Sequence, residues 1–270
     1  MGTTWLFNVL RAMADAAETP LGVVADGVEP PPASWTGPII VKSHRADSPA
    51  LLSSFDSSAD LRSIVMMRDP EAALASLQRT QRVDLEELIG WLEADFSSYE
   101  VALPVMSRVA VIREEWVAPR GAEIIGQLAS LLELGLREEQ VASIADEFSR
   151  DRVRDQVAQL EKAQAWRGEF TEYDRQTQWH AGHIGPDGPR TVELSDSLRV
   201  RVAALRSSID DLVDQFGLWE ASWPRSGAGS PAGAQAFITA RAQEIAARSP
   251  QPSLVSRVLG RLHVPGHPRG

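Results

Sequence analysis

Three short clusters near the start of the chain combine residue types that bind anions and move protons. They are Gly2-Thr3-Thr4-Trp5, Lys42-Ser43-His44, and Arg68 together with Ser76. In the first cluster, glycine lets the backbone approach a ligand closely, and the unpaired N–H groups of a helix start favour phosphate or sulfate. The cluster is therefore a candidate anion cradle, although an ordinary helix start capped by Thr3 or Thr4 has the same residues.

The second cluster places a cation beside a titratable base. Lys42 and His44 directly follow the apolar run 38–41. A lysine there can hold an anion, and an imidazole, whose pKa lies close to working pH, can remove a proton from a hydroxyl. The alternative for this tripeptide alone is a polar turn facing solvent.

The third cluster suits a phosphate group. Arg68 ends another apolar run, and its planar guanidinium matches the geometry of phosphate oxygens. Ser76 lies two turns into the helix expected after Pro70, so its hydroxyl can join Arg68 on one phosphate. Arg-Asp-Pro also occurs as a plain strand-to-helix turn, with Asp69 as the cap.

A fourth segment, His180-Ala181-Gly182-His183, carries a glycine that lets the backbone approach a ligand. The spacing of His180 and His183 is compatible with metal binding, but no third ligand stands nearby and the chain contains no cysteine. We therefore predict no metal site. The lack of cysteine also excludes disulfides and a thiolate nucleophile.

Hydrophobic periodicity predicts the elements that position these clusters. Leu6, Val9, Leu10 and Met13 predict a first helix that ends near residue 17. Short apolar runs predict strands at 21–24, 38–42, 61–67 and 109–112, and helical patterns cover 70 onward, 84–100, 119–133, 137–147, 149–163 and 196–216. Strands alternating with helices indicate a parallel sheet flanked by helices, whose ligand sites lie beyond the carboxyl ends of the strands.

Composition limits the class of protein and its partners. The chain has 270 residues, of which 43% are hydrophobic, and a formal net charge of −10. Such a charge argues against nucleic acid or anionic lipid as a partner. No apolar run approaches the roughly 20 residues of a membrane-spanning helix. The N-terminus lacks the basic region of a signal peptide, so we expect a cytoplasmic protein.

Taken in order, the clusters resemble the sulfotransferases that use 3′-phosphoadenosine 5′-phosphosulfate (PAPS). Gly2-Thr3-Thr4-Trp5 is similar to the second half of that family's donor loop, and Lys42-Ser43-His44 looks like its Lys-Thr-His element. Arg68-Asp69-Pro70 with Ser76 resembles its Arg-Asn/Asp-Pro element and the serine that follows. Each match is short, and the specificity comes from their common order.

The resemblance implies a three-layer, P-loop-like α/β fold over residues 1–222, a linker at 223–232 and a basic helical tail at 233–270. For the donor, it implies that Gly2, Thr3 and Thr4 hold the 5′-phosphosulfate and that Trp5 stacks on adenine. Arg68 and Ser76 would bind the 3′-phosphate.

For catalysis, the resemblance implies that Lys42 neutralises charge in the transition state and that His44 is the general base on an acceptor hydroxyl. No metal is implied. His180 and Gly182 would stand where the family has an Arg-Lys-Gly loop, and Arg113-Glu114-Glu115 where it has Tyr-Glu-Asp. The acceptor is left open between a small molecule and a glycan.

The resemblance also implies a strand and a basic residue ahead of Met1, so the predicted fold lacks its first strand within this sequence. We expect codons upstream of Met1 to encode that strand; the alternative is a protein that lacks it and is impaired. Two other functions remain open. One is a degenerate, non-catalytic member that binds a nucleotide or a protein partner. The other is a P-loop kinase, disfavoured because the first cluster has no lysine.

Overall fold

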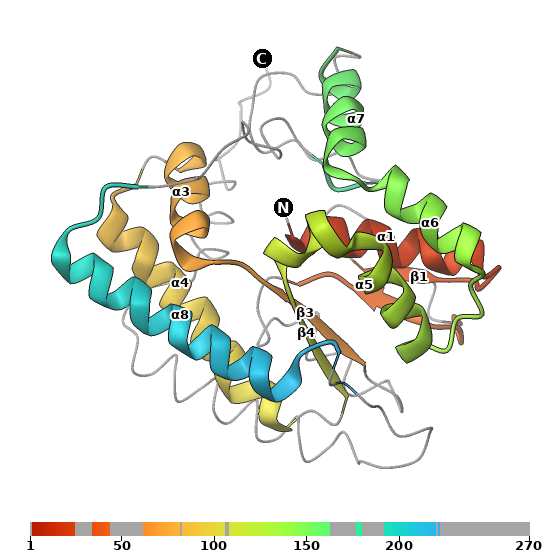
Figure 1. The fold of residues 1–270 in the computed structure, drawn as a ribbon, viewed down its shortest axis with the longest axis horizontal. Helices are drawn as coiled ribbons and strands as arrows, with labels where there is room; N and C mark the ends of the chain where they lie inside the picture. The colour runs from red at the N-terminus through yellow and green to blue at the C-terminus, as the bar shows by residue number, and fades with distance from the viewer. Residues whose placement is uncertain are drawn as a thin grey trace, which may run out of the picture.

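The computed structural model forms helices and strands where the sequence patterns predict them (Figure 1). It describes residues 2–24, 34–43, 62–81, 83–105, 108–162, 177–179, 192–219 and 221. The described helices are α1 (Gly2–Ala16), α3 (Pro70–Thr80), α4 (Leu85–Ala102), α5 (Val117–Leu131), α6 (Glu138–Glu147), α7 (Arg150–Lys162) and α8 (Asp196–Phe216). The described strands are β1 (Gly22–Val24), β2 (Ile39–Val41), β3 (Ser63–Met67) and β4 (Val109–Arg113).

Each of these elements lies within a few residues of its predicted range. The one difference of consequence is at the N-terminus, where α1 begins at Gly2. Thr3 and Thr4 therefore lie inside the first turn of the helix rather than at its cap. The predicted boundary at 222, the linker 223–232, the tail 233–270 and the site residues His44, His180 and Gly182 fall outside the described residues.

The described strands pair in parallel, as predicted for an α/β protein. β1 pairs with β2, and β3 pairs with β4 in a register that runs from Ser63 opposite Val109 to Met67 opposite Arg113. These are two separate two-stranded sheets. The three-layer fold expected from the sequence, with one parallel sheet between two layers of helices, therefore stays a prediction.

Helices lie on both faces of the β3–β4 pair (Figure 1). Side chains on β4 point alternately to one face and the other, so they take part in two hydrophobic clusters. Ala110 and Ile112 belong to a cluster formed with α1, α5, α6 and α7. Val109 and Val111 belong to a second cluster formed with α3, α4 and α8. A strand that is apolar on both faces is typical of a parallel sheet between helical layers.

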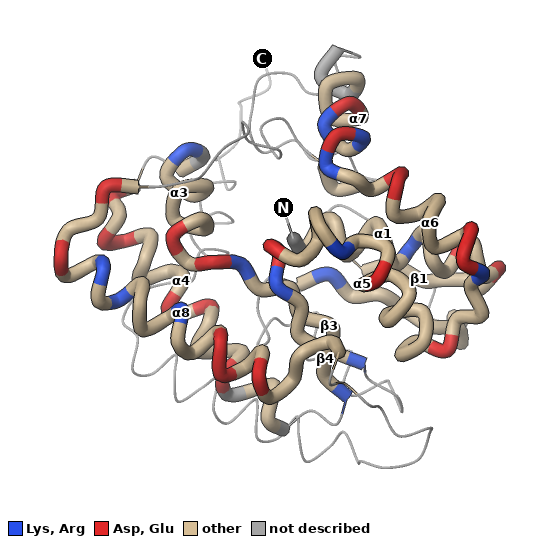
Figure 2. Tube along the Cα trace, in the orientation of Figure 1, with Lys and Arg blue, Asp and Glu red and all other residues tan. Residues whose placement is uncertain are grey.

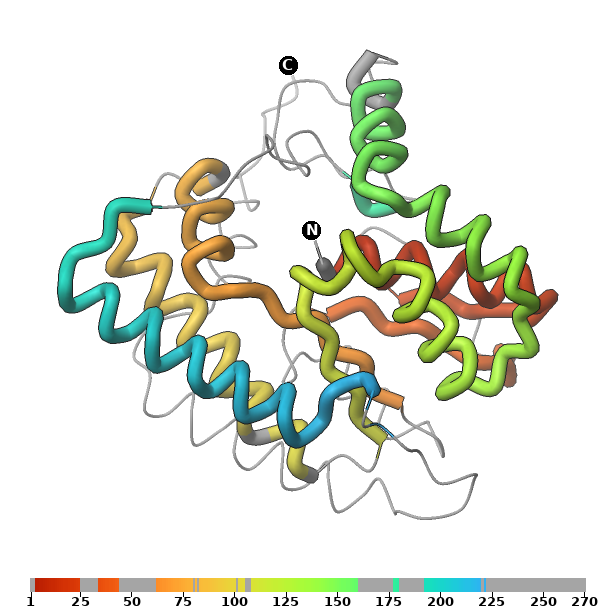
Figure 3. Tube along the Cα trace, in the orientation of Figure 1, coloured from red at the N-terminus to blue at the C-terminus, as the bar shows by residue number. Residues whose placement is uncertain are grey.

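The chain returns to β4 after α8, the longest of the described helices. Figure 3 shows α8 lying alongside α4, where Arg201 of α8 donates to both carboxylate oxygens of Glu93 at 2.8 and 2.6 Å. Beyond α8, Gly217 forms a parallel bridge with Val111, and the Leu218 N–H donates to the Val111 carbonyl at 3.0 Å. Both edges of β4 are thus hydrogen-bonded.

No helix within the described ranges is long and apolar enough to cross a membrane.

Candidate functional site

A cavity of about 710 Å³ lies where the carboxyl ends of β3 and β4 meet the start of α1. Two residues from different predicted clusters, Trp5 and Arg68, line it together. Phe148 and Arg150, at the junction of α6 and α7, line it too. The cavity combines aromatic and apolar surface with these two guanidinium groups and with the carboxylates of Glu114, Glu115 and Asp151.

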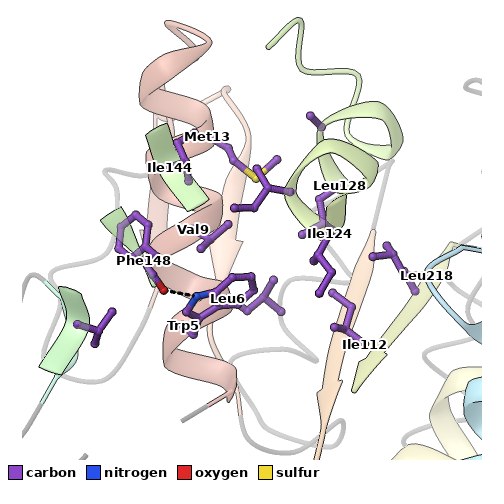
Figure 4. Close-up of a cluster of buried hydrophobic side chains, with 14 of the residues drawn as sticks. Trp5, Leu6, Val9, Met13, Ile112, Ile124, Leu128, Ile144, Phe148 and Leu218 are labelled. Carbon is purple, nitrogen blue, oxygen red and sulfur yellow. Dashed lines mark hydrogen bonds between the residues drawn. The ribbon is translucent and has the colours of Figure 1, made fainter. Parts of the chain in front are cut away.

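Trp5 is fixed in place by the core behind it. Its side chain is only 4% exposed, and its indole Nε1 donates to the Phe148 carbonyl at 2.9 Å (Figure 4). Figure 4 also shows Val9 and Met13 continuing the same buried face of α1. Trp5 is therefore mainly a core residue, and only a small apolar part of it contributes to the cavity wall.

The first and second clusters meet at the end of β2. Lys42 Nζ donates to Thr4 Oγ1 at 3.1 Å and lies 5.7 Å from the centre of the Phe7 ring. Lys42 directly follows β2, and Thr4 lies in the first turn of α1. The structure thus brings the predicted lysine to the helix start that is predicted to hold an anion. His44 of the same cluster lies outside the described residues.

The segment that precedes His180 is anchored against α1. Asn8 Nδ2 donates to the carbonyl of Thr177 at 2.7 Å and to that of Thr4 at 3.0 Å. Trp179 is fully buried in the same core as Trp5. Residues 177–179 therefore lie next to the helix that bears the first cluster.

Arg68 forms an ion pair with Glu114, with 2.9 Å between Arg68 Nε and Glu114 Oε2. The register of the sheet explains this pair. Met67 lies opposite Arg113, so the next residue of each strand end, Arg68 and Glu114, emerges side by side. Figure 2 shows basic and acidic positions together where β3 leads into α3 and where β4 leads into α5.

Asp69 holds the turn that presents Arg68. Its Oδ1 caps α3 by accepting from the N–H groups of Glu71 and Ala72, and its own N–H donates to Glu115 Oε1 at 2.7 Å. Its Oδ2 accepts from Arg206 Nε of α8 at 2.7 Å. Burial raises the pKa of this carboxyl, but the hydrogen bonds and charge of Arg206 and the N–H groups outweigh it and hold the pKa below its ordinary value.

Ser76 lies one turn farther along α3 than Ala72, which lines the cavity. Residues four apart share a helix face, so the half-buried Ser76 is on the cavity side of α3. Among the described site residues, the structure therefore joins Thr4 with Lys42 and Trp5 with Arg68, and it places Ser76 one turn from that cavity.

Sequence reasoning missed several residues of this site. Phe148, Ser149 and Arg150 line the cavity, and Arg206 fixes the Arg68 turn from α8. A serine ahead of a polar helix is a cap signal that indicates where α7 begins, but nothing local places that start beside β3. The rule that residues after parallel strands share one edge of the sheet places Glu114 near that edge, but its pairing with Arg68 depends on the strand register.

No protein-family model matches the chain, and no curated protein matches it either. Within the described ranges, no group of three or more histidine, aspartate or glutamate side chains is arranged to hold a metal ion. The arguments for function therefore rest on the residues and geometry of the cavity.

Proposed function

We propose that this protein is a sulfotransferase that moves a sulfuryl group from PAPS to an acceptor hydroxyl. One observation carries the proposal: a single cavity joins Trp5 at the start of α1 to Arg68 at the end of β3. These residues are far apart in the sequence and belong to two of the three ordered clusters. The contact between Thr4 and Lys42 ties in the remaining cluster at 3.1 Å.

The chemistry of the cavity fits an adenine nucleotide with more than one anionic group. Its volume of about 710 Å³ lies in the range of roughly 300–1,000 Å³ typical of ligand pockets. Adenine would lie against the aromatic and apolar part of the cavity wall, to which Trp5 contributes the 4% of its surface that is exposed, and Arg68 and Ser76 are the proposed partners of the 3′-phosphate. The 5′-phosphosulfate would then extend toward Thr3, Thr4 and Lys42.

The proposed reaction is an in-line transfer. The acceptor oxygen forms a bond to sulfur as the bond between sulfur and the bridging oxygen breaks, and the bridging oxygen leaves on adenosine 3′,5′-bisphosphate. His44 accepts the proton of the acceptor hydroxyl. Lys42 stabilises the negative charge that develops on the transferring group, which is the main source of catalysis in transfers of this kind.

The same proposal extends to a P-loop-like, three-layer fold. It is supported by the way α1 meets both sheets at one end: Thr4 contacts Lys42 after β2, and Trp5 lines a cavity with Arg68 after β3. Such convergence at the carboxyl ends is expected when the two pairs belong to one parallel sheet.

The enzymatic role is tested by His44→Ala. Transfer of labelled sulfate from PAPS should be measured for wild type and variant over a panel of phenols, sugars, lipid-linked glycans and natural-product alcohols. We expect the variant to lose turnover by at least about a hundredfold, while its affinity for adenosine 3′,5′-bisphosphate stays within twofold. Loss of turnover and affinity together would instead place His44 in the nucleotide pocket.

A degenerate, non-catalytic member that binds a nucleotide or a protein partner is the second candidate, and the Arg68–Glu114 ion pair favours it, because a carboxylate beside the proposed phosphate partner weakens the donor binding that catalysis needs. Binding of adenosine 3′,5′-bisphosphate without sulfate transfer to any member of the panel would support this second role and contradict the first.

A further inference from the structure

Arg68 already has a negative partner in the proposed nucleotide cavity. Its Nε lies 2.9 Å from Glu114 Oε2, and both side chains are largely shielded from water, at 18% and 17% exposed. Both residues line the cavity. An anion that binds Arg68 must therefore either displace this carboxylate or bind beside it.

The pairing is built into the backbone. β3 and β4 run in parallel with Met67 opposite Arg113, and the following residues, Arg68 and Glu114, continue that register. The neighbouring pair confirms the alignment, since the Asp69 N–H donates to Glu115 Oε1 at 2.7 Å. With Glu115 engaged in this way, Glu114 is the carboxylate that faces the guanidinium of Arg68.

A carboxylate in this position opposes anion binding in two ways. It neutralises the charge of Arg68 as an ion-pair partner, and its own charge repels a phosphate in a site where shielding from water strengthens electrostatic interactions. It also keeps Arg68 from being a buried, unpaired charge when the cavity holds no ligand. The result is a phosphate site that is stable when empty and releases its ligand readily.

We propose that Glu114 is a built-in competitor for Arg68 that weakens binding of the 3′-phosphate and speeds release of the nucleotide product. The identity of the ligand rests on the proposed function, but the competition between Glu114 and an anion does not. Because release of product limits the turnover of many transferases, such a residue would keep the nucleotide from being held too long.

The test compares wild type with Glu114→Gln, which keeps the shape of the side chain and removes its charge. Isothermal titration with adenosine 3′,5′-bisphosphate, AMP and inorganic phosphate gives the affinities, and stopped-flow displacement gives the dissociation rate of the bisphosphate. We expect the variant to bind the bisphosphate about tenfold more tightly, mostly through slower dissociation. Inorganic phosphate should also bind more tightly, and the affinity for AMP should stay within twofold.

Glu93→Gln is the matched control, because Glu93 forms an ion pair with Arg201 at 2.6 Å between α4 and α8, away from the cavity. It should leave all three affinities unchanged. Weaker or unchanged binding of bisphosphate and phosphate to a folded Glu114→Gln protein overturns the proposal, since Glu114 would then orient Arg68 or have no effect. If wild type does not prefer bisphosphate to AMP but Glu114→Gln still tightens phosphate binding, the proposed function fails and the competition stands.

Discussion

Asp69 links three parts of the site through one short side chain and one backbone N–H. Its carboxylate caps α3 and accepts from Arg206 of α8, and its N–H donates to Glu115 after β4. Arg68, immediately before it, is held by these contacts as well as by its own ion pair. At the residue scale, the site depends on how firmly this turn is fixed.

The lowered pKa of Asp69 predicts a pH-dependent contribution to stability. A carboxyl whose pKa is lower in the folded protein stabilises it above the unfolded value of about 3.9, and this contribution is lost as pH falls through the folded value. We expect Asp69→Asn to lower the free energy of unfolding by about 1 kcal/mol at pH 7, and by progressively less below about pH 4.

Urea denaturation of both proteins between pH 7 and pH 3 measures this difference. Asp84→Asn is the matched control, because Asp84 caps α4 through the N–H of Glu87 at 2.8 Å. It should cost less at pH 7, since an asparagine can keep the cap bond at either position, whereas at residue 69 it also loses the charge interaction with Arg206. A difference between wild type and Asp69→Asn that does not shrink toward pH 3 would contradict the account.

At the scale of elements, the return of the chain after α8 secures the second edge of β4. Gly217 follows α8 and bridges Val111, so β4, the strand that Glu114 directly follows, is bonded on both sides. Residue 217 must be glycine for the backbone to lie this close to the end of α8, because a Cβ there would be 2.6 Å from the carbonyl oxygen of Val213. Gly126 in α5 has no such neighbour within 4 Å.

Two glycine-to-alanine substitutions should therefore have opposite effects. Gly217→Ala is expected to lower the free energy of unfolding by about 1–3 kcal/mol through the clash. Gly126→Ala is expected to raise it by about 0.5–1 kcal/mol, because alanine restricts the unfolded chain and favours a helix interior. Urea denaturation measures both, and equal effects of the same sign would show that the contact at residue 217 is not as tight as described.

The pattern of the elements could be predicted from the sequence, but the partners of their side chains could not. Leu6, Val9 and Met13 recur with the helical period, and their burial follows from it. The pairing of Arg68 with Glu114 depends on strand register, which a single sequence does not contain. Likewise, the contact of Arg206 with Asp69 crosses from α8 to α3, and no local signal indicates it.

For the whole molecule, the sequence predicts parallel strands between helices, and the described strands confirm their direction. Their division into two pairs is a matter of long-range pairing that periodicity does not determine. Long-range contacts also decide the surroundings of Trp5. The family resemblance implies that its ring contacts the nucleotide, whereas the structure shows its indole bonded to the Phe148 carbonyl and packed within the core. Scaffold and site therefore share residues at the start of α1.

The central claim is that the cavity between Trp5 and Arg68 binds a nucleotide through its 3′-phosphate. Isothermal titration of wild type with adenosine 3′,5′-bisphosphate and with AMP tests it most directly. Arg68→Gln is the informative variant, and Arg199→Gln, which removes an exposed arginine of α8, is the control.

We expect wild type to bind the bisphosphate at least about tenfold more tightly than AMP, because a charge-assisted contact contributes roughly 1.5–3 kcal/mol. Arg68→Gln should reduce that preference to within about twofold, and Arg199→Gln should keep it. Equal affinity of wild type for the two nucleotides, or a preference that survives in Arg68→Gln, would contradict the assignment of this cavity.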